Sequence, residues 1–162
     1  MSLYTLLQLL HVLSAMWLVG GLLGRAVALS SARRAPEMRI IKAIADVSGR
    51  LENLMIAPGI FAVLVTGIAT AVAGGISLLG PIDGGPWWVV VPLLILVFAV
   101  VTTPLTLSHD RRWGQALEDA AQRGVVTDTL RVYLDGRAMF RHYAPDIAAV
   151  VLIVALMVLK PF

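Results

Sequence analysis

Three histidines, ten acidic residues and no cysteine limit the chemistry that this chain can perform. Because cysteine is absent, disulfides, thiolate metal sites and thiol nucleophiles are excluded. His11 is the most informative of these residues, since it lies roughly 10–12 Å inside the first apolar segment by helix rise. Ionisable residues inside a membrane segment are costly and are commonly functional. The competing interpretation is a neutral imidazole bonded to Ser14 or to a backbone carbonyl.

The positions of the histidines bear on which metal centre they could form. His11, His109 and His142 are far apart in the sequence, whereas a zinc site needs ligands grouped at one depth, so zinc is not expected. A haem needs only one or two axial ligands, usually His or Met, and a slot between helices. His11 suits that requirement, and the sequence contains neither a hydrolase motif nor a phosphate-binding loop.

Other ionisable residues lie near the predicted ends of the apolar segments. Glu52, His109 and His142 are expected to cap helices or to pair with nearby arginines. Asp146 follows His142 by about one helical turn, which favours an ion pair with Arg141 or His142 over a proton relay. A weaker hypothesis joins Glu52, His109, His142 and Asp146 into a proton or small-solute pathway.

The composition indicates that these residues are placed in a membrane. The chain has 162 residues, of which 59% are hydrophobic and 14% are charged, and its mean hydropathy is +0.86. A soluble domain usually carries about a quarter charged residues. The net charge of +3 does not indicate a nucleic-acid partner, because the basic residues flank apolar segments and alternate with acidic ones.

Four apolar stretches are long enough to cross a bilayer, for which about 20 helical residues are needed. They cover residues 3–24, 51–73, 87–107 and 143–159. Segments 25–50 and 108–142 each contain six Lys or Arg, and of the 13 basic residues only Lys160 lies elsewhere. Positive charge favours the cytoplasmic side, so both termini are predicted outside, with Trp87 and Trp88 at the outer interface. The fold class is therefore an all-α, single-domain transmembrane four-helix bundle.

Helical patterns also continue into the two basic segments. Pro36 is a good helix start, so the second helix is expected to begin there in the cytoplasm, with Gly49 as the candidate for a break. The third helix is expected to continue through residues 113–117, and residues 125–139 are expected to form a short amphipathic surface helix. Kinks are expected at four prolines. These are Pro58, Pro92, Pro104 and Pro145.

Polar and small residues share one face of each predicted helix. In the first helix this stripe comprises Tyr4, Leu7, His11, Ser14, Leu18, Gly21 and Arg25. In the second it comprises Glu52, Met55, Gly59, Ala62, Thr66 and Ala69 or Thr70, and in the third Thr102, Thr106 and His109. The fourth helix opens with Arg141, His142 and Tyr143. Such faces are expected to point toward other helices, with Gly20 and Gly24 allowing close packing.

Three short stretches together resemble known proteins. They are LHVLSAMW at residues 10–17 before Gly20-Gly21, LMIAPG at residues 54–59 before Thr66-Gly67, and VLKPF at residues 158–162. In these stretches the chain resembles a bacterial family of predicted integral membrane proteins of unknown function. More distantly it is similar to the HemJ-type protoporphyrinogen oxidases, which are small haem-b membrane proteins.

The resemblance implies roles for particular residues. His11 matches a haem-ligating histidine, and Met55 or His109 is the candidate for a second ligand. Lys160 matches a terminal lysine. The sequence departs from the HemJ type at residues 22–25, where Leu-Leu-Gly-Arg stands in place of a segment with a proline and an arginine. This departure weakens the case for porphyrinogen oxidation more than the case for haem binding.

The leading hypothesis is a haem-b-binding protein of the bacterial inner membrane, with a redox or porphyrin-oxidising role. His11 would be the axial ligand, and Met55 and Ser14 would contribute to the cofactor site. The second hypothesis is a non-catalytic small subunit or scaffold, acting as a homo-oligomer or with partner membrane subunits. The pathway hypothesis stays third, because its residues lie mainly in the cytoplasmic half.

Overall fold

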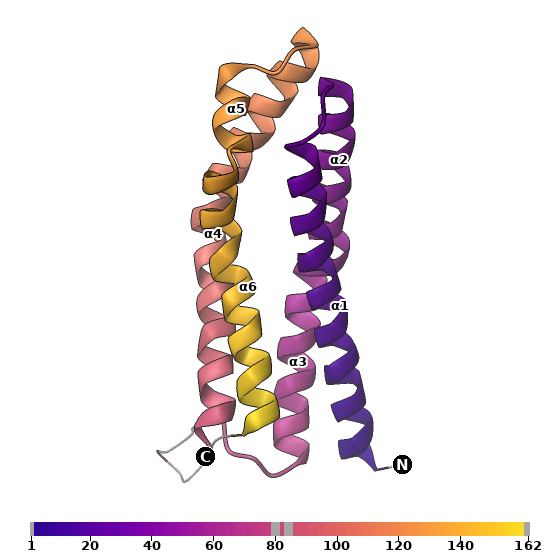
Figure 1. The fold of residues 1–162 in the computed structure, drawn as a ribbon. Helices are drawn as coiled ribbons and strands as arrows, with labels where there is room; N and C mark the ends of the chain where they lie inside the picture. The colour runs from indigo at the N-terminus through magenta and orange to yellow at the C-terminus, as the bar shows by residue number, and fades with distance from the viewer. Residues whose placement is uncertain (1, 79–81, 83–85, 161–162) are drawn as a thin grey trace.

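The computed structural model describes residues 2–78, 82 and 86–160, and their side chains except at residues 102–111 and 137–143. In this part of the chain all regular secondary structure is helical, as predicted. The elements are α1 (Leu3–Ala32), α2 (Met38–Leu51), the π-helical segment η1 (Glu52–Ile56), α3 (Ala57–Ala73), α4 (Trp87–Arg123), α5 (Asp128–Leu134) and α6 (Gly136–Leu159). Figure 1 shows α1 beside α2 and α3, α4 beside α6, and both termini at the same end.

Helix α1 begins as the sequence suggests but ends later. Ser2 caps its N-terminus by accepting a hydrogen bond from the Thr5 N–H at 3.2 Å. The predicted end at residue 24 is wrong, because the helix continues to Ala32. Leu29 and Ala32, which are 3% and 0% exposed, explain the extension, since this last turn packs against other helices.

Helices α2 and α3 form one continuous helical rod from Met38 to Ala73, interrupted by η1 and not at Gly49. The cause lies at Pro58, which has no N–H to donate to the Leu54 carbonyl. The ladder shifts to longer bonds here, since the Ala57 N–H donates to the Glu52 carbonyl. The Trp17 indole N–H from α1 donates to the Leu54 carbonyl at 3.4 Å. The helix is therefore irregular beside Pro58, where the sequence predicted a kink.

The second half of the chain differs from its prediction in where the helices end. Helix α4 extends past residue 117 to Arg123 and stops at Gly124, whose φ of 68° suits a residue without a side chain. The prediction of one helix over residues 125–139 is wrong. Asp135 is extended and separates α5 from α6. The fourth helix accordingly begins at Gly136 instead of residue 143. Both α4 and α6 continue as helices through their prolines.

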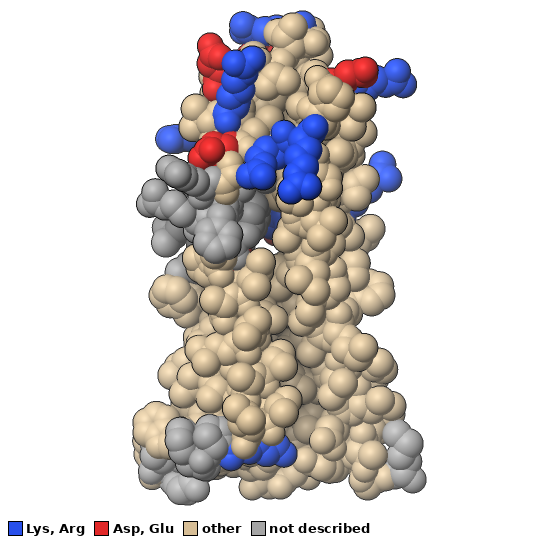
Figure 2. Space-filling view, viewed as in Figure 1, with Lys and Arg blue, Asp and Glu red and all other residues tan. Residues whose placement is uncertain are grey.

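A compact apolar core lies at the end of the molecule opposite the termini. It is formed by the last turn of α1, the inner face of α2, the end of α4 and α5. Its buried members are Ala32, Met38, Ile41, Ala45, Leu117, Ala120, Leu130 and Leu134. Figure 2 shows basic side chains gathered over this end, above an uncharged middle band.

Two helical segments of the described chain are long and apolar enough to cross a membrane. They are α1 and the rod Met38–Ala73. Two shorter apolar helical segments are Trp87–Val101 in α4 and Ala144–Leu159 in α6. The apolar parts of α1 and α3 lie side by side, and their contact contains His11 (Figure 1).

Candidate functional site

The contact between α1 and α3 follows a seven-residue repeat along α1. The paired positions are Tyr4 with Gly74, His11 with Gly67, Leu18 with Gly59 and Arg25 with Glu52. A Cβ atom added to Gly67 would lie 2.9 Å from the His11 Cε1 atom, so the imidazole occupies the space that the missing side chain leaves. Because the two helices are antiparallel neighbours, each member of the repeat lies at its own depth along the contact.

The predicted stripe on the first helix is confirmed as its inward face. Leu18 and Gly21 are buried, and the other five members are half-buried. The stripe on the second helix behaves in the same way, with Gly59 buried and its other members half-buried. The predicted stripe on the third helix falls on side chains outside the described part of the structure.

His11 is anchored to α3 through Thr66. Its Nδ1 atom lies 3.2 Å from the Thr66 Oγ1 atom. The Thr66 hydroxyl in turn donates to the Ala62 carbonyl, one turn earlier on α3, at 2.5 Å. The hydrogen-bonding partner of the ring is therefore on α3. The sequence had placed Thr66 on the inward face without pairing it with His11.

Ser14 is not the hydrogen-bonding partner of His11 among the described residues. Its hydroxyl donates to the Leu10 carbonyl of its own helix at 2.8 Å, a common arrangement for serine in a helix. The structure does not support the pairing of His11 with Ser14, because the hydrogen bond of the imidazole among the described residues is to Thr66.

Met55 lies at a different depth from His11. Its side chain packs against two glycines of α1, with its Cε atom 3.6 Å from a Cβ position on Gly20 and its Cβ atom 2.7 Å from one on Gly21. Gly20 and His11 are nine positions apart, which is about 14 Å by helix rise. The structure does not bring Met55 and His11 together. The Gly20 face of α1 is covered by Met55 of the same chain. Gly24 is covered by Leu51 in the same way.

The ionisable candidates near the end opposite the termini are partly described. Glu52 pairs with Arg25 between η1 and α1, which confirms the expected pairing with a nearby arginine. Asp146 is exposed. The side chains of His109, Arg141 and His142 lie outside the described residues, so their predicted roles stay predictions.

Lys160 follows the last turn of α6. Its Nζ atom lies 5.2 Å from the centre of the Trp88 ring at the start of α4. This cation–π contact links the ends of the two helices. The structure therefore gives the terminal lysine a packing partner.

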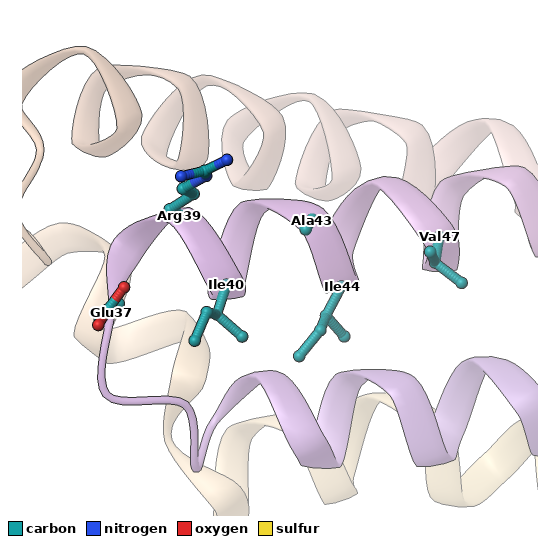
Figure 3. Close-up of a pocket in the computed structure, with 6 residues that line it drawn as sticks. All are labelled: Glu37, Arg39, Ile40, Ala43, Ile44 and Val47. Carbon is teal, nitrogen blue, oxygen red and sulfur yellow. The ribbon is translucent and has the colours of Figure 1, made fainter.

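A shallow groove lies on α2, far from His11. It is lined by Glu37, Arg39, Ile40, Ala43, Ile44 and Val47 (Figure 3). Val47 and Gly67 are twenty positions apart on one rod, or about 30 Å. This groove is therefore separate from the His11 site. Among the described side chains, no group of three His, Asp or Glu residues could hold a metal ion.

An all-helical chain with two long apolar helices, joined through glycines and a few polar side chains, has the architecture of an integral membrane protein. Residues 5–161 match the family described as "Predicted integral membrane protein (DUF2269)", and the chain belongs to this family. Neither a curated protein nor a solved structure matches it. The predicted membrane class is thus confirmed, and the similarity to the HemJ type stays a prediction.

Proposed function

We propose that this protein binds haem b within the membrane, with the His11 imidazole as an axial ligand. The observation that carries the proposal is the placement of His11. It is a half-buried imidazole inside an apolar helix, held to a second helix by a hydrogen bond to Thr66. Histidine is the most common haem ligand, and a hydrogen bond to its other nitrogen is typical of metal-ligating histidines.

The surroundings of His11 limit which side chains could be the second axial ligand of a haem bound there. Met55 lies about 14 Å away along the helix axis, so it is not part of the proposed ligand set. His109 is 22 positions from the start of α4 and His11 is eight positions from the start of α1, and both starts lie at the same end of the molecule (Figure 1), so by helix rise the two residues differ in depth by about 20 Å and no second ligand is proposed. A bound haem would supply one-electron chemistry, and this supports a redox role as the broader proposal, with porphyrin oxidation of the HemJ type as the narrower one.

We also propose that the chain crosses the bacterial inner membrane four times, with both termini outside. Both termini lie at one end of the molecule, and basic side chains gather at the other (Figures 1 and 2). The apolar segments Trp87–Val101 and Ala144–Leu159 would be parts of the third and fourth crossings. Labelling of single cysteines at residue 2 and residue 124 in intact cells tests this topology, because the chain has no native cysteine.

An absorption spectrum tests the haem proposal directly. The protein is expressed with haem supplied and purified in mild detergent. Wild type is expected to show a Soret band that His11→Ala removes. Ser14→Ala and Met55→Leu are matched controls that keep the band, because neither side chain reaches His11. A colourless wild type, or an unchanged band in His11→Ala, would overturn the proposal.

A self-associating structural protein is the second candidate function, and it rests on the α2 groove. Ile40 and Val47 are 41% and 51% exposed, and with Ile44 they follow the four-then-three spacing of a coiled-coil seam (Figure 3). Two copies in one membrane would place their α2 helices parallel, so the seams could meet.

Cysteine cross-linking tests this second candidate in a chain without native cysteine. Val47→Cys is expected to form a disulfide-linked dimer under mild oxidation if the seams meet. Asp46→Cys, which lies on another side of α2, is the control and should stay monomeric. Equal cross-linking of the two variants, or none at Val47, would remove this candidate.

A further inference from the structure

Thr66 lies between the His11 imidazole and the backbone of α3. A threonine hydroxyl carries one proton and can also accept hydrogen bonds. In this structure the Thr66 hydroxyl lies 2.5 Å from the Ala62 carbonyl and 3.4 Å from the Val63 carbonyl, both of which can only accept. The proton of Thr66 is therefore directed to its own helix. The Thr66 Oγ1 atom lies 3.2 Å from the His11 Nδ1 atom and offers it a lone pair that can accept a hydrogen bond.

This arrangement decides which nitrogen of His11 carries a proton. An acceptor at Nδ1 requires an Nδ1–H donor, and a neutral imidazole has only one N–H. Nε2 is then the nitrogen with the free lone pair. We propose that Thr66 is a positioning residue that fixes His11 as the Nδ1–H tautomer and thereby makes Nε2 the ligand nitrogen. The tautomer stands on the hydrogen bonds alone, and its use for iron rests on the proposed function.

Gly67 completes the position of the ring. A Cβ atom at residue 67 would lie 2.9 Å from Cε1, 3.3 Å from Nδ1 and 3.8 Å from Nε2 of His11. The missing side chain lets the edge of the ring approach α3 closely enough to reach Thr66. Thr66 and Gly67 therefore act together, since one sets the direction of the hydrogen bond and the other gives the ring its space.

The chain offers a matched control one turn further along α3. The Thr70 hydroxyl donates to the Thr66 carbonyl at 2.7 Å, just as the Thr66 hydroxyl donates to Ala62. The α1 residue beside this turn is Tyr4, which packs against Gly74, and not a histidine. Thr70→Val thus removes the same kind of backbone bond as Thr66→Val without touching His11.

Nitrogen NMR of the haem-free protein tests the tautomer without any cofactor. In a His109→Gln/His142→Gln background, ¹⁵N-labelled His11 is the only histidine signal. The expected result is a protonated Nδ1 and an unprotonated Nε2. Thr66→Val should move the ring toward a mixture of tautomers, while Thr66→Ser and Thr70→Val should keep the wild-type pattern. An Nε2–H tautomer in wild type, or no change in Thr66→Val, would overturn the inference.

Haem-loaded protein tests the consequence for the ligand. Loss of a partner behind a metal-ligating histidine typically weakens metal binding by about 10–100-fold. Thr66→Val is expected to lose haem affinity to that extent and to shift the Soret band, with rescue by Thr66→Ser and no change in Thr70→Val. If wild type binds no haem while NMR shows Nδ1–H, the proposed function fails and the tautomer stands. If His11 ligates haem and Thr66→Val binds it as wild type does, the role of Thr66 fails alone.

Discussion

The two ends of the rod Met38–Ala73 pack by different means. At the end opposite the termini, α2 buries large apolar side chains, and Ile41 and Leu130 are almost completely inaccessible. Along α3, the contact with α1 is made through glycines and through the hydrogen bond between His11 and Thr66. Most residues of that second contact are only half-buried within the chain.

The difference follows from the surroundings of each end. In water, burying apolar surface is favourable by about 25 cal/mol per Å², so large side chains gather in a core. In lipid that driving force between helices is absent, and association depends on close backbone approach and on hydrogen bonds. A membrane contact can therefore include an imidazole and a hydroxyl, whereas the core at the end opposite the termini is almost entirely apolar.

The largest expected effect lies in the apolar core at the end opposite the termini. Leu130→Ala should lower the free energy of unfolding by about 2–5 kcal/mol, because it leaves a cavity at a side chain with no exposed surface. Val132→Ala on the same helix is the control and should change stability by about 0.5 kcal/mol or less, because Val132 is 67% exposed. Denaturant unfolding in mild detergent measures both. Similar losses in the two variants would contradict a water-driven core at this end.

A single methyl group tests the membrane contact. A Cβ atom on Gly59 would lie 3.1 Å from the Leu18 Cβ atom and 3.2 Å from its Cα atom, and this backbone cannot move aside cheaply. Gly59→Ala is expected to cost about 1–3 kcal/mol of stability through overpacking. Thermal unfolding in detergent provides the measurement.

The control for Gly59 is Gly20 of α1, which faces Met55 of η1. Gly20→Ala would place its Cβ atom at an ordinary 3.6 Å from the flexible end of Met55. It should be neutral or gain up to about 1 kcal/mol from helix propensity. If Gly59→Ala were tolerated and Gly20→Ala lost stability, the packing described for these two glycines would be contradicted.

The sequence predicted periodic features well and helix ends poorly. The stripes through His11 and Thr66 followed from helix geometry, because each face is a property of one helix. The continuation of α1 to Ala32 depends on contacts with α2 and with distant residues of α4 and α5. The pairing of His11 with Thr66, and the separation of Met55 from it, depend on the register between two helices, which neither helix encodes alone.

The boundary between the two regions is marked by the Arg25–Glu52 ion pair. The side chains are 18% and 37% exposed, so this pair is better shielded than those on the surface. Glu52→Gln is expected to cost about 1.5–3 kcal/mol, the range for hydrogen bonds to charged groups. A double-mutant cycle with Arg25→Gln measures the coupling by chemical unfolding. Additive losses would show that the two side chains contribute independently and that the boundary needs no ion pair.

The smallest expected effect is at the surface of the end opposite the termini. Lys42 and Glu118 join α2 to α4 with an Nζ–Oε2 distance of 3.0 Å, outside the predicted membrane segment 51–73. Both side chains are more than a third exposed, so Glu118→Gln should cost less than about 1 kcal/mol. A loss as large as that of Leu130→Ala would mean that charge, and not apolar burial, holds this end together.

The pH dependence of this pair sharpens the same comparison. The hydrogen bond that the Lys42 ammonium donates to the Glu118 carboxylate raises the pKa of Lys42 above its ordinary value of 10.5. A cation with a raised pKa contributes stability fully below its unfolded-state pKa and loses that contribution as the pH rises through the folded-state pKa. The difference between wild type and Glu118→Gln should therefore be constant near neutral pH and shrink above about pH 10.5. Asp119→Asn, which breaks the pair with Arg123, is the control and should show no such decline, because an arginine stays charged.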